Sequence, residues 1–249
     1  MIKSRKVGIK MDTIKIKKGA TQIVAHRGLS GIEKENTNSA FVAAGNRSYY
    51  GIETDIRRTI DGRFVICHDG NLNRIAGVDV LVESTALSDL QSVVLLDVDG
   101  NSNRTDLRVS VLEDYISICK KYDKHCVLEL KLEFTEEEIS QIIDIFKSFD
   151  YLENVTFITF YYSNITMLRS ICPMQSVQLL FSKFDDELIA KLIADRVDAD
   201  VRYTAVTKEL ISVMHEHGLK VNCWTVNDKD LAEQLCEWDI DYITTNILE

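Results

Sequence analysis

The sequence contains a single proline, Pro173, in 249 residues. Linkers rich in proline, glycine and serine commonly separate domains, and no such stretch divides this chain. Apolar residues make up 45% of the sequence, which is enough to bury a sizeable core. The composition therefore favours one domain over several.

The sequence also lacks a long apolar run. No segment reaches the roughly 18 apolar residues that a membrane-spanning helix requires. The basic residues near the N-terminus are not followed by the apolar stretch of a secretory signal. We therefore expect a cytoplasmic protein without stable membrane insertion, which could still be a homo-oligomer.

Paired cysteines are absent. Six cysteines are scattered along the chain and none forms a CxxC pair. Without a secretory signal, a disulfide framework is not expected, and the thiols are predicted to be free and mostly buried. They are Cys67, Cys119, Cys126, Cys172, Cys223 and Cys236.

Charge is distributed unevenly along the chain. The first 18 residues hold seven basic side chains and one acid, Asp12, which gives a local charge of about +6. Because the net charge of the whole chain is −10, the remaining residues carry about −16. An acidic body repels polynucleotides, so nucleic acid is not an expected partner. Residues 1–21 are predicted to form a basic, solvated N-terminal extension, although such a tail can also contact anionic lipid or nucleic acid.

From residue 22 onward, short apolar runs alternate with amphipathic segments, which predicts a parallel sheet covered by helices. About eight such units in this length favour a (β/α)8 TIM barrel, an α/β fold, over residues 22–249. An Asp61-Gly62 turn after the second strand indicates a hairpin, followed by a polar insertion over about 69–108 with one weak helix near 88–94. Strands are expected at 22–28, 51–59, 126–132, 155–161, 176–181, 198–203, 220–226 and 241–246.

Ionisable residues gather at the ends of the predicted strands, where TIM barrels carry their active sites. Side chains alternate along a strand, so Glu53 and Asp55 share one face, and Glu129 and Lys131 share another. Buried charges need a partner or a metal, and three converging carboxylates would repel one another without a cation. All-oxygen ligation suits Mg²⁺ or Ca²⁺.

Basic and imidazole side chains accompany these carboxylates. Arg27 and Lys131 suit an anionic substrate, for which phosphate is the natural candidate. His26 and His68 lie at strand ends and can transfer protons at neutral pH. The residue types therefore predict metal-assisted cleavage of a phosphoester.

Five linked motifs resemble those of the glycerophosphodiester phosphodiesterase family. The chain reads AHRG, ENT, GIETDIRRTIDGRFVICHD, LELK and NCWTVN, where the family has HRG, PENT, ExD with TxDG and HD, a Glu-x-Lys strand and a WTVN strand. Their order and spacing agree over nearly the whole chain, and the set is far more specific than any one motif.

The resemblance implies a TIM barrel that hydrolyses glycerophosphodiesters to glycerol 3-phosphate and an alcohol. It implies that His26 and His68 are the general acid and base, and that Glu53, Asp55 and Glu129 bind one divalent cation, Mg²⁺ or Ca²⁺. By the same resemblance, Arg27 and Lys131 hold the phosphate and Trp224 forms an aromatic wall. Neither the order of the two histidines, nor the nucleophile (water or the neighbouring glycerol hydroxyl), nor the head group follows from it.

The sequence departs from the family pattern at three positions. Lys34 stands in place of the proline of PENT, and the final strand reads DYITTN where the family has DGIITD, so Tyr242 replaces glycine and Asn246 replaces aspartate. Asn246 falls at the carboxyl end of the eighth strand, where a change bears on substrate fit.

Other interpretations of the same residues remain. The histidines could bond backbone groups in the core, Glu53 and Asp55 could pair with Arg57 or Arg58, and Glu129 could simply pair with Lys131.

Two rival functions are compatible with the same residues. One is a phospholipase-type lipid phosphodiesterase on the same barrel, which needs an apolar rim beyond the VDVLV at 78–82. The other is a non-catalytic phosphodiester-binding protein.

Overall fold

Eight parallel strands form a closed barrel in the computed structural model, which describes residues 12–249. Round the barrel they run β1-β10-β9-β8-β7-β6-β5-β2, and β2 pairs again with β1 to close the ring. The predicted TIM barrel is thereby confirmed. The strands are β1 (Gln22–Ala25), β2 (Gly51–Arg58), β5 (His125–Leu130), β6 (Val155–Thr159), β7 (Ser176–Phe181), β8 (Asp198–Arg202), β9 (Val221–Trp224) and β10 (Tyr242–Thr245).

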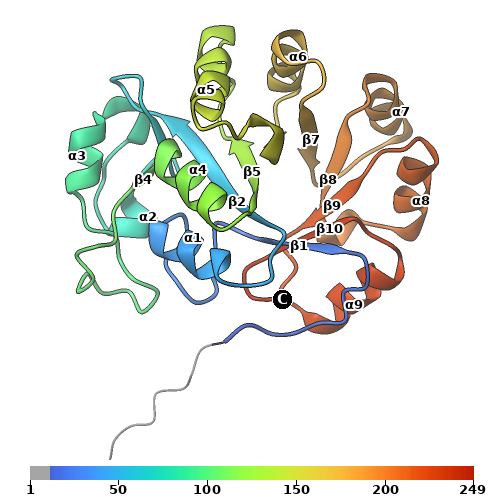
Figure 1. Cartoon of the computed structure of the whole chain (residues 1–249), viewed down its shortest axis with the longest axis horizontal. Helices are drawn as coiled ribbons and strands as arrows, with labels where there is room; N and C mark the ends of the chain where they lie inside the picture. Colours follow the sequence, from blue (N-terminus) through green and yellow to red (C-terminus); the bar gives the residue numbers. More distant parts are fainter. Residues whose placement is uncertain (1–11) are drawn as a thin grey trace, which may run out of the picture.

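Helices cover the outside of the barrel (Figure 1). Several begin at a side-chain cap, as at Thr135, whose hydroxyl and Glu138 form a capping box with the backbone of α5, which fixes where that helix starts. The longer helices are α1 (Asn38–Gly45), α4 (Leu112–Lys121), α5 (Glu136–Ser148), α6 (Tyr162–Ile171), α7 (Asp186–Asp195), α8 (Lys208–Glu216) and α9 (Lys229–Glu237), with short 3₁₀ turns η2 (Leu152–Asn154) and η3 (Tyr203–Ala205).

The core has two layers because strand side chains alternate between the helices and the barrel interior. In β8, Ala199 and Val201 belong to the main cluster between strands and helices. A smaller interior cluster fills the barrel and includes Val24, Val127 and Ile158. Polar residues that occupy interior-facing positions near the carboxyl ends of the strands therefore face the barrel's mouth.

The insertion after β2 forms a small lobe beside the barrel (Figure 1). Strands β3 (Phe64–Ile66) and β4 (Ser110–Val111) continue the sheet from β2 in antiparallel pairing. The predicted weak helix is α3 (Leu87–Ser92), and the lobe also contains α2 (Asn73–Ala76) and η1 (Val82–Ser84), which were not predicted. Spaced apolar residues build a separate core: Val65, Cys67, Leu72, Ile75, Val82, Leu90, Leu95, Leu107 and Val109.

The described part of the N-terminal extension runs along the outside of the barrel near α9 (Figure 1). Ile14 forms a parallel bridge with Leu248, and Lys15 Nζ lies 2.7 Å from Glu249 Oε1. Residues 1–11 of the predicted extension lie outside the described residues. Within 12–249, no helix combines the length and apolar character needed to cross a bilayer.

Candidate active site

A tight turn follows β1 at the mouth of the barrel. Arg27 has a φ of 53°, a left-handed conformation uncommon for residues other than glycine. Its N–H donates to Glu53 Oε2 at 2.8 Å. Gly28 has a φ of 74°, and a Cβ there would lie 2.7 Å from the backbone of Ala40, so this position requires glycine. The sequence HRG thus forms a turn that holds Arg27 against β2.

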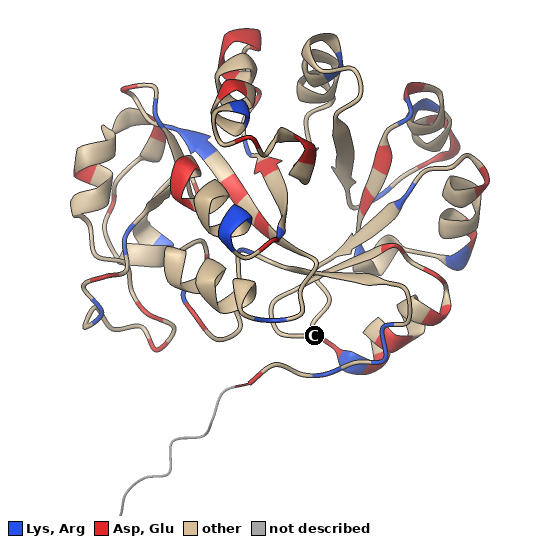
Figure 2. Cartoon of the chain, viewed as in Figure 1, with Lys and Arg blue, Asp and Glu red and all other residues tan. Residues whose placement is uncertain are grey.

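Three carboxylates from two neighbouring strands converge inside the barrel. Asp55 of β2 and Glu129 of β5 are paired in register. One oxygen from each of Glu53, Asp55 and Glu129 lies within 4.8 Å of the others, although their exposures are only 2%, 0% and 7%. Figure 2 shows the acidic positions of β2 and β5 lying together at the centre of the molecule.

Two cationic side chains contact this cluster. Arg27 Nε lies 3.3 Å from Asp55 Oδ2, and Lys131 Nζ lies 2.7 Å from Glu129 Oε1 and 3.5 Å from Asp55 Oδ1. Although burial favours the neutral acid, Arg27 and Lys131 hold the pKa of Asp55 well below its usual range.

The cluster has the character of a cation site. Burial, and then the charge of Asp55, raise the pKa of Glu53 well above its ordinary value and that of Glu129 to about 7. Asp55 Oδ1 accepts no hydrogen bond within residues 12–249. Two buried carboxyl groups that resist ionisation, crowded beside the ionised Asp55, would be stabilised as carboxylates by a hard divalent cation, so these three residues fit Mg²⁺ or Ca²⁺.

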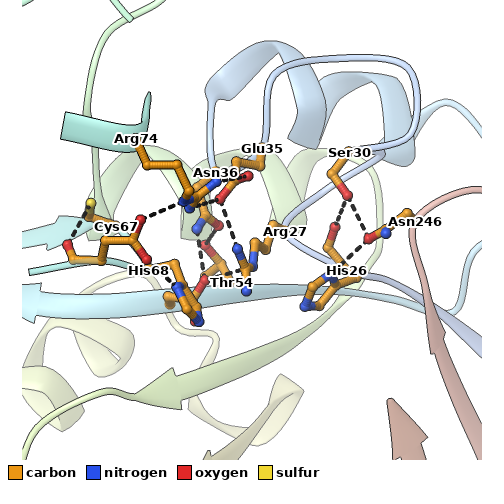
Figure 3. Close-up of polar contacts among 12 residues, drawn as sticks. His26, Arg27, Ser30, Glu35, Asn36, Thr54, Cys67, His68, Arg74 and Asn246 are labelled. Carbon is orange, nitrogen blue, oxygen red and sulfur yellow. Dashed lines mark hydrogen bonds and ion pairs between the residues drawn. The ribbon is translucent and has the colours of Figure 1, made fainter. Parts of the chain in front are cut away.

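His26 is oriented by a neutral amide. Its Nδ1 lies 2.7 Å from Oδ1 of Asn246, an oxygen that also accepts a hydrogen bond from Ser30 Oγ at 2.9 Å (Figure 3). An amide oxygen only accepts, so this network assigns the proton to Nδ1 and leaves Nε2 free. Nε2 lies 3.9 Å from Glu53 Oε2. Burial, and then Arg27, lower the pKa of His26 to about 4.

His68 is oriented by a carboxylate instead. Its Nδ1 lies 2.6 Å from Asp69 Oδ1, and Arg74 Nε donates to Asp69 Oδ2 at 2.6 Å. Arg74 also donates to Glu35, which accepts a further bond from Arg27 Nη1 at 2.8 Å (Figure 3). Burial lowers the pKa of His68, while Asp55 and Asp69 oppose that shift. The carboxylate fixes the proton on Nδ1 and leaves Nε2 unprotonated in the neutral ring, and His68 lines both cavities of the site described below.

The basic residues that follow Asp55 in β2 do not pair with the cluster. Arg57 Nη1 contacts Glu83 and its guanidinium donates to the carbonyl of His68, so it supports the loop that carries the second imidazole. Arg58 contacts Glu138 of α5. Of the alternative pairings, only Glu129–Lys131 is present, and Lys131 also reaches Asp55.

Trp224 forms one wall of an enclosed cavity of about 230 Å³ at the mouth of the barrel. Its indole Nε1 donates to the backbone carbonyl of Asp200 at 3.2 Å, and its ring packs edge-on against Phe160 at 5.7 Å. Asp55 is fully buried and contacts two of the lining residues. The other predicted site residues all line this cavity: His26, Arg27, Glu53, His68, Glu129, Lys131 and Trp224.

A second, open cavity of about 970 Å³ lies between the insertion and the loop after β6. Its walls include Asn71 and Leu81 of the insertion and Tyr161 of the β6–α6 connection. The two cavities share His68, Glu129, Lys131 and Phe160. Glu129, at one edge of the carboxylate cluster, therefore lies where the smaller, partly enclosed cavity meets the open one.

Sequence reasoning did not assign the residues that hold the site in place. Glu35 and Asn36 belong to the ENT motif, and Asn36 donates to Asp55 Oδ2 at 2.8 Å. Asp69 follows His68 directly, and Asn246 stood out only as a departure from the family pattern. Their adjacency to motif residues was the available signal, but their contacts come from loops whose paths a sequence does not specify.

Fold and site together define the class of protein: a TIM barrel with ionisable side chains gathered at its mouth. Residues 26–249 match the model of the glycerophosphoryl diester phosphodiesterase family. The chain belongs to this family.

Relatives of known and unknown activity resemble the chain over nearly its whole length. YqiK, an uncharacterised Bacillus subtilis protein, is 29% identical over 234 residues, covering 92% of this chain and 96% of its own. A glycerophosphodiester phosphodiesterase of Bacillus altitudinis is 24% identical, covering 91% and 94%. The structure of an Oleispira antarctica phosphodiesterase in complex with the product sn-glycerol-3-phosphate is similar with a TM-score of 0.82 at 25% identity, covering 91% and 93%.

Proposed function

We propose that this protein hydrolyses glycerophosphodiesters to sn-glycerol 3-phosphate and an alcohol, with a divalent cation bound by Glu53, Asp55 and Glu129. One observation carries the proposal: two imidazoles with oriented Nδ1 atoms flank the three carboxylates where two cavities meet. Family membership and the product named in the Oleispira complex support the choice of substrate.

The chain's own residues provide binding and charge compensation. Arg27 and Lys131 lie beside the cluster and hold the phosphate oxygens, so negative charge that grows in the transition state meets fixed positive groups. Lys131 is pinned by Glu129 and Asp55, which keeps its ammonium at the cavity. A bound Mg²⁺ or Ca²⁺ supplies Lewis-acid stabilisation of the same phosphate.

The two histidines divide the proton transfers according to their partners. His26 donates from Nδ1 to a neutral amide oxygen, so its Nε2 lone pair is available to accept a proton from the nucleophile. His68 bonds a carboxylate, Asp69, which stabilises its protonated form and suits it to donate a proton from Nε2 to the leaving oxygen. The nucleophile, water or the neighbouring glycerol hydroxyl, is left open by this arrangement.

A coupled assay for released glycerol 3-phosphate tests the function. The wild-type protein, incubated with glycerophosphocholine and Mg²⁺ or Ca²⁺, should release product, and EDTA should abolish release. His26→Ala should lower the rate by about 10²–10⁴-fold. Binding of glycerophosphocholine without any product release would instead favour the non-catalytic phosphodiester-binding protein.

A lipid phosphodiesterase is the second candidate, and one observation favours it. Leu81 and Phe160, exposed by 54% and 46%, both line the open cavity, where an acyl chain could lie. Comparing turnover on phospholipid vesicles with turnover on water-soluble glycerophosphocholine separates the two, because equal or faster turnover on vesicles would favour the lipid substrate. A cytoplasmic location and a homo-oligomeric state stay predictions from the sequence.

A further inference from the structure

One buried acid of the enclosed cavity has no role in the proposed reaction. Asp200 lies on β8, which is four strands from β2 in either direction round the ring, so it faces the carboxylate cluster from across the barrel. It is 1% exposed and lines the cavity of about 230 Å³. Neither of its carboxyl oxygens has a hydrogen-bond partner among the described residues.

The strand geometry directs Asp200 into the cavity. Its neighbours Ala199 and Val201 pack outward into the main core, so Asp200 faces inward. It is paired in register with Leu180, a member of the interior cluster. The bond from Trp224 Nε1 to its backbone carbonyl holds this part of β8 against the aromatic wall.

Among residues 12–249, the one polar side chain beside the Asp200 carboxyl group is Asn222, its in-register neighbour on β9, and it makes no hydrogen bond to either carboxyl oxygen. The nearby wall residues Ile158, Leu180 and Phe160 are apolar, and Thr244 Oγ1 already exchanges hydrogen bonds with the Asn222 side chain at 2.9 and 3.2 Å. A buried polar group without a hydrogen-bond partner costs free energy. This indicates that a bound ligand supplies the missing partner of the Asp200 carboxyl group.

The protonation state of this carboxyl group indicates what kind of ligand it accepts. Burial raises the pKa of Asp200 well above its usual value; Asn222 opposes the rise and Glu129 adds to it. The resulting neutral acid offers one donor and one acceptor, the complement of an alcohol hydroxyl, which also offers both.

The two cavities provide separate places for the two alcohol halves of the substrate. They share His68, Glu129 and Lys131, so a phosphate held at this junction has one alcohol in each space. The open cavity of about 970 Å³ suits head groups of varied size, and the enclosed one suits a compact polyol. We propose that Asp200 determines specificity for glycerol by hydrogen-bonding the hydroxyl most distant from the phosphate; this inference rests on the proposed function.

A pair of substrates isolates that hydroxyl. Glycerophosphocholine is compared with its 1-deoxy analogue (sn numbering), the phosphocholine diester of propane-1,2-diol, which keeps the hydroxyl next to the phosphoester carbon. The kcat/KM of the wild-type protein should be about 10- to 100-fold higher for glycerophosphocholine, because the analogue leaves a buried carboxyl group unpaired. Equal kcat/KM values would overturn the inference and leave the proposed function intact, whereas cleavage of neither substrate would overturn both.

Three variants identify the residue responsible. Asp200→Leu should bring the kcat/KM ratio close to one, while Asp200→Asn should keep most of it, because an amide also offers a donor and an acceptor. Gln178→Leu is the matched control: Gln178 is also buried and lies on the adjacent β7, but it does not line the cavity, so the ratio should not change. An Asp200→Asn variant that discriminates as poorly as Asp200→Leu, or an Asp200→Leu variant that discriminates like the wild type, would overturn the assignment.

Discussion

Replacing Glu53 by glutamine should distinguish the stability that a bound cation adds from the stability of the fold without a cation. The amide oxygen of glutamine can still accept the hydrogen bond that Arg27 N–H now donates at 2.8 Å, so the turn after β1 keeps its anchor. The variant loses one of the three carboxyl groups that can carry a negative charge in the cluster. We expect it to be more stable than the wild-type protein in EDTA and to gain little stability from Mg²⁺ or Ca²⁺.

The distances of the cluster set the magnitude. Two like unit charges 4.8 Å apart, the upper limit for the oxygens of this cluster, repel by about 3.5 kcal/mol at an effective dielectric constant of about 20. Glu53 belongs to two such pairs, but it avoids most of this repulsion by staying protonated, so the net gain in EDTA should be about 1–2 kcal/mol. A cation at about 100 times its Kd should stabilise the wild-type protein by about 2.7 kcal/mol, which raises Tm by about 5–10 °C in a chain of this size.

Guanidinium and thermal unfolding of both proteins, in EDTA and across a range of Mg²⁺ and Ca²⁺ concentrations, measure these differences. The reasoning would be refuted if divalent cations stabilised Glu53→Gln as much as the wild type. A variant that is less stable than the wild type in EDTA would also contradict it, since the carboxylate would then be favourable to the fold without a cation.

Further predictions concern the second histidine, the turn and the pH dependence of stability. His68→Gln should lower kcat by about 10²–10⁴-fold, and Asp69→Asn should lower it less, both measured by release of glycerol 3-phosphate. Gly28→Ala should lower the free energy of unfolding by more than about 2 kcal/mol because its Cβ meets backbone; Gly62→Ala, with the same φ of 74° and open space, should cost only about 1 kcal/mol. Burial, and then Lys220, lower the pKa of His125 from 6.5 to about 4, so the unfolded chain binds a proton there that the folded protein does not. Stability should therefore fall as pH drops from 6.5 towards 4, by up to about 3 kcal/mol from this group, and denaturation of His125→Gln at pH 7 and about pH 4.5 should show a smaller loss.

The barrel was predictable from the sequence because its signals are local and repeated. Apolar strands such as 126–130 alternate with helices that have apolar faces and caps, and eight such units admit few topologies. The insertion was less predictable. Its short helices, such as α2 at Asn73–Ala76, are held by a separate small core, and that core depends on apolar residues too widely spaced to show periodicity.

Within the site, residues on strands were easier to find than residues on loops. The period of two along β2 and β5 places Glu53 and Asp55 on one face and Glu129 on the face of Lys131, and the apolar residues on the opposite faces indicate that these polar faces point inward. The contacts between loops were not predictable, because Asn246 approaches His26 from the other end of the chain and Glu35 approaches Arg74 across two loops. Nothing in the sequence marked Asp200 as a site residue, because acidic residues are also common at solvent-exposed strand ends.

The most direct test is a crystal structure of the protein with Ca²⁺ and sn-glycerol 3-phosphate. The account predicts one cation bound by oxygens of Glu53, Asp55 and Glu129 at about 2.3–2.6 Å. It also predicts the phosphate between Arg27 and Lys131, with His26 and His68 on either side. Ca²⁺ bound elsewhere, or a phosphate bound away from these residues, would contradict it.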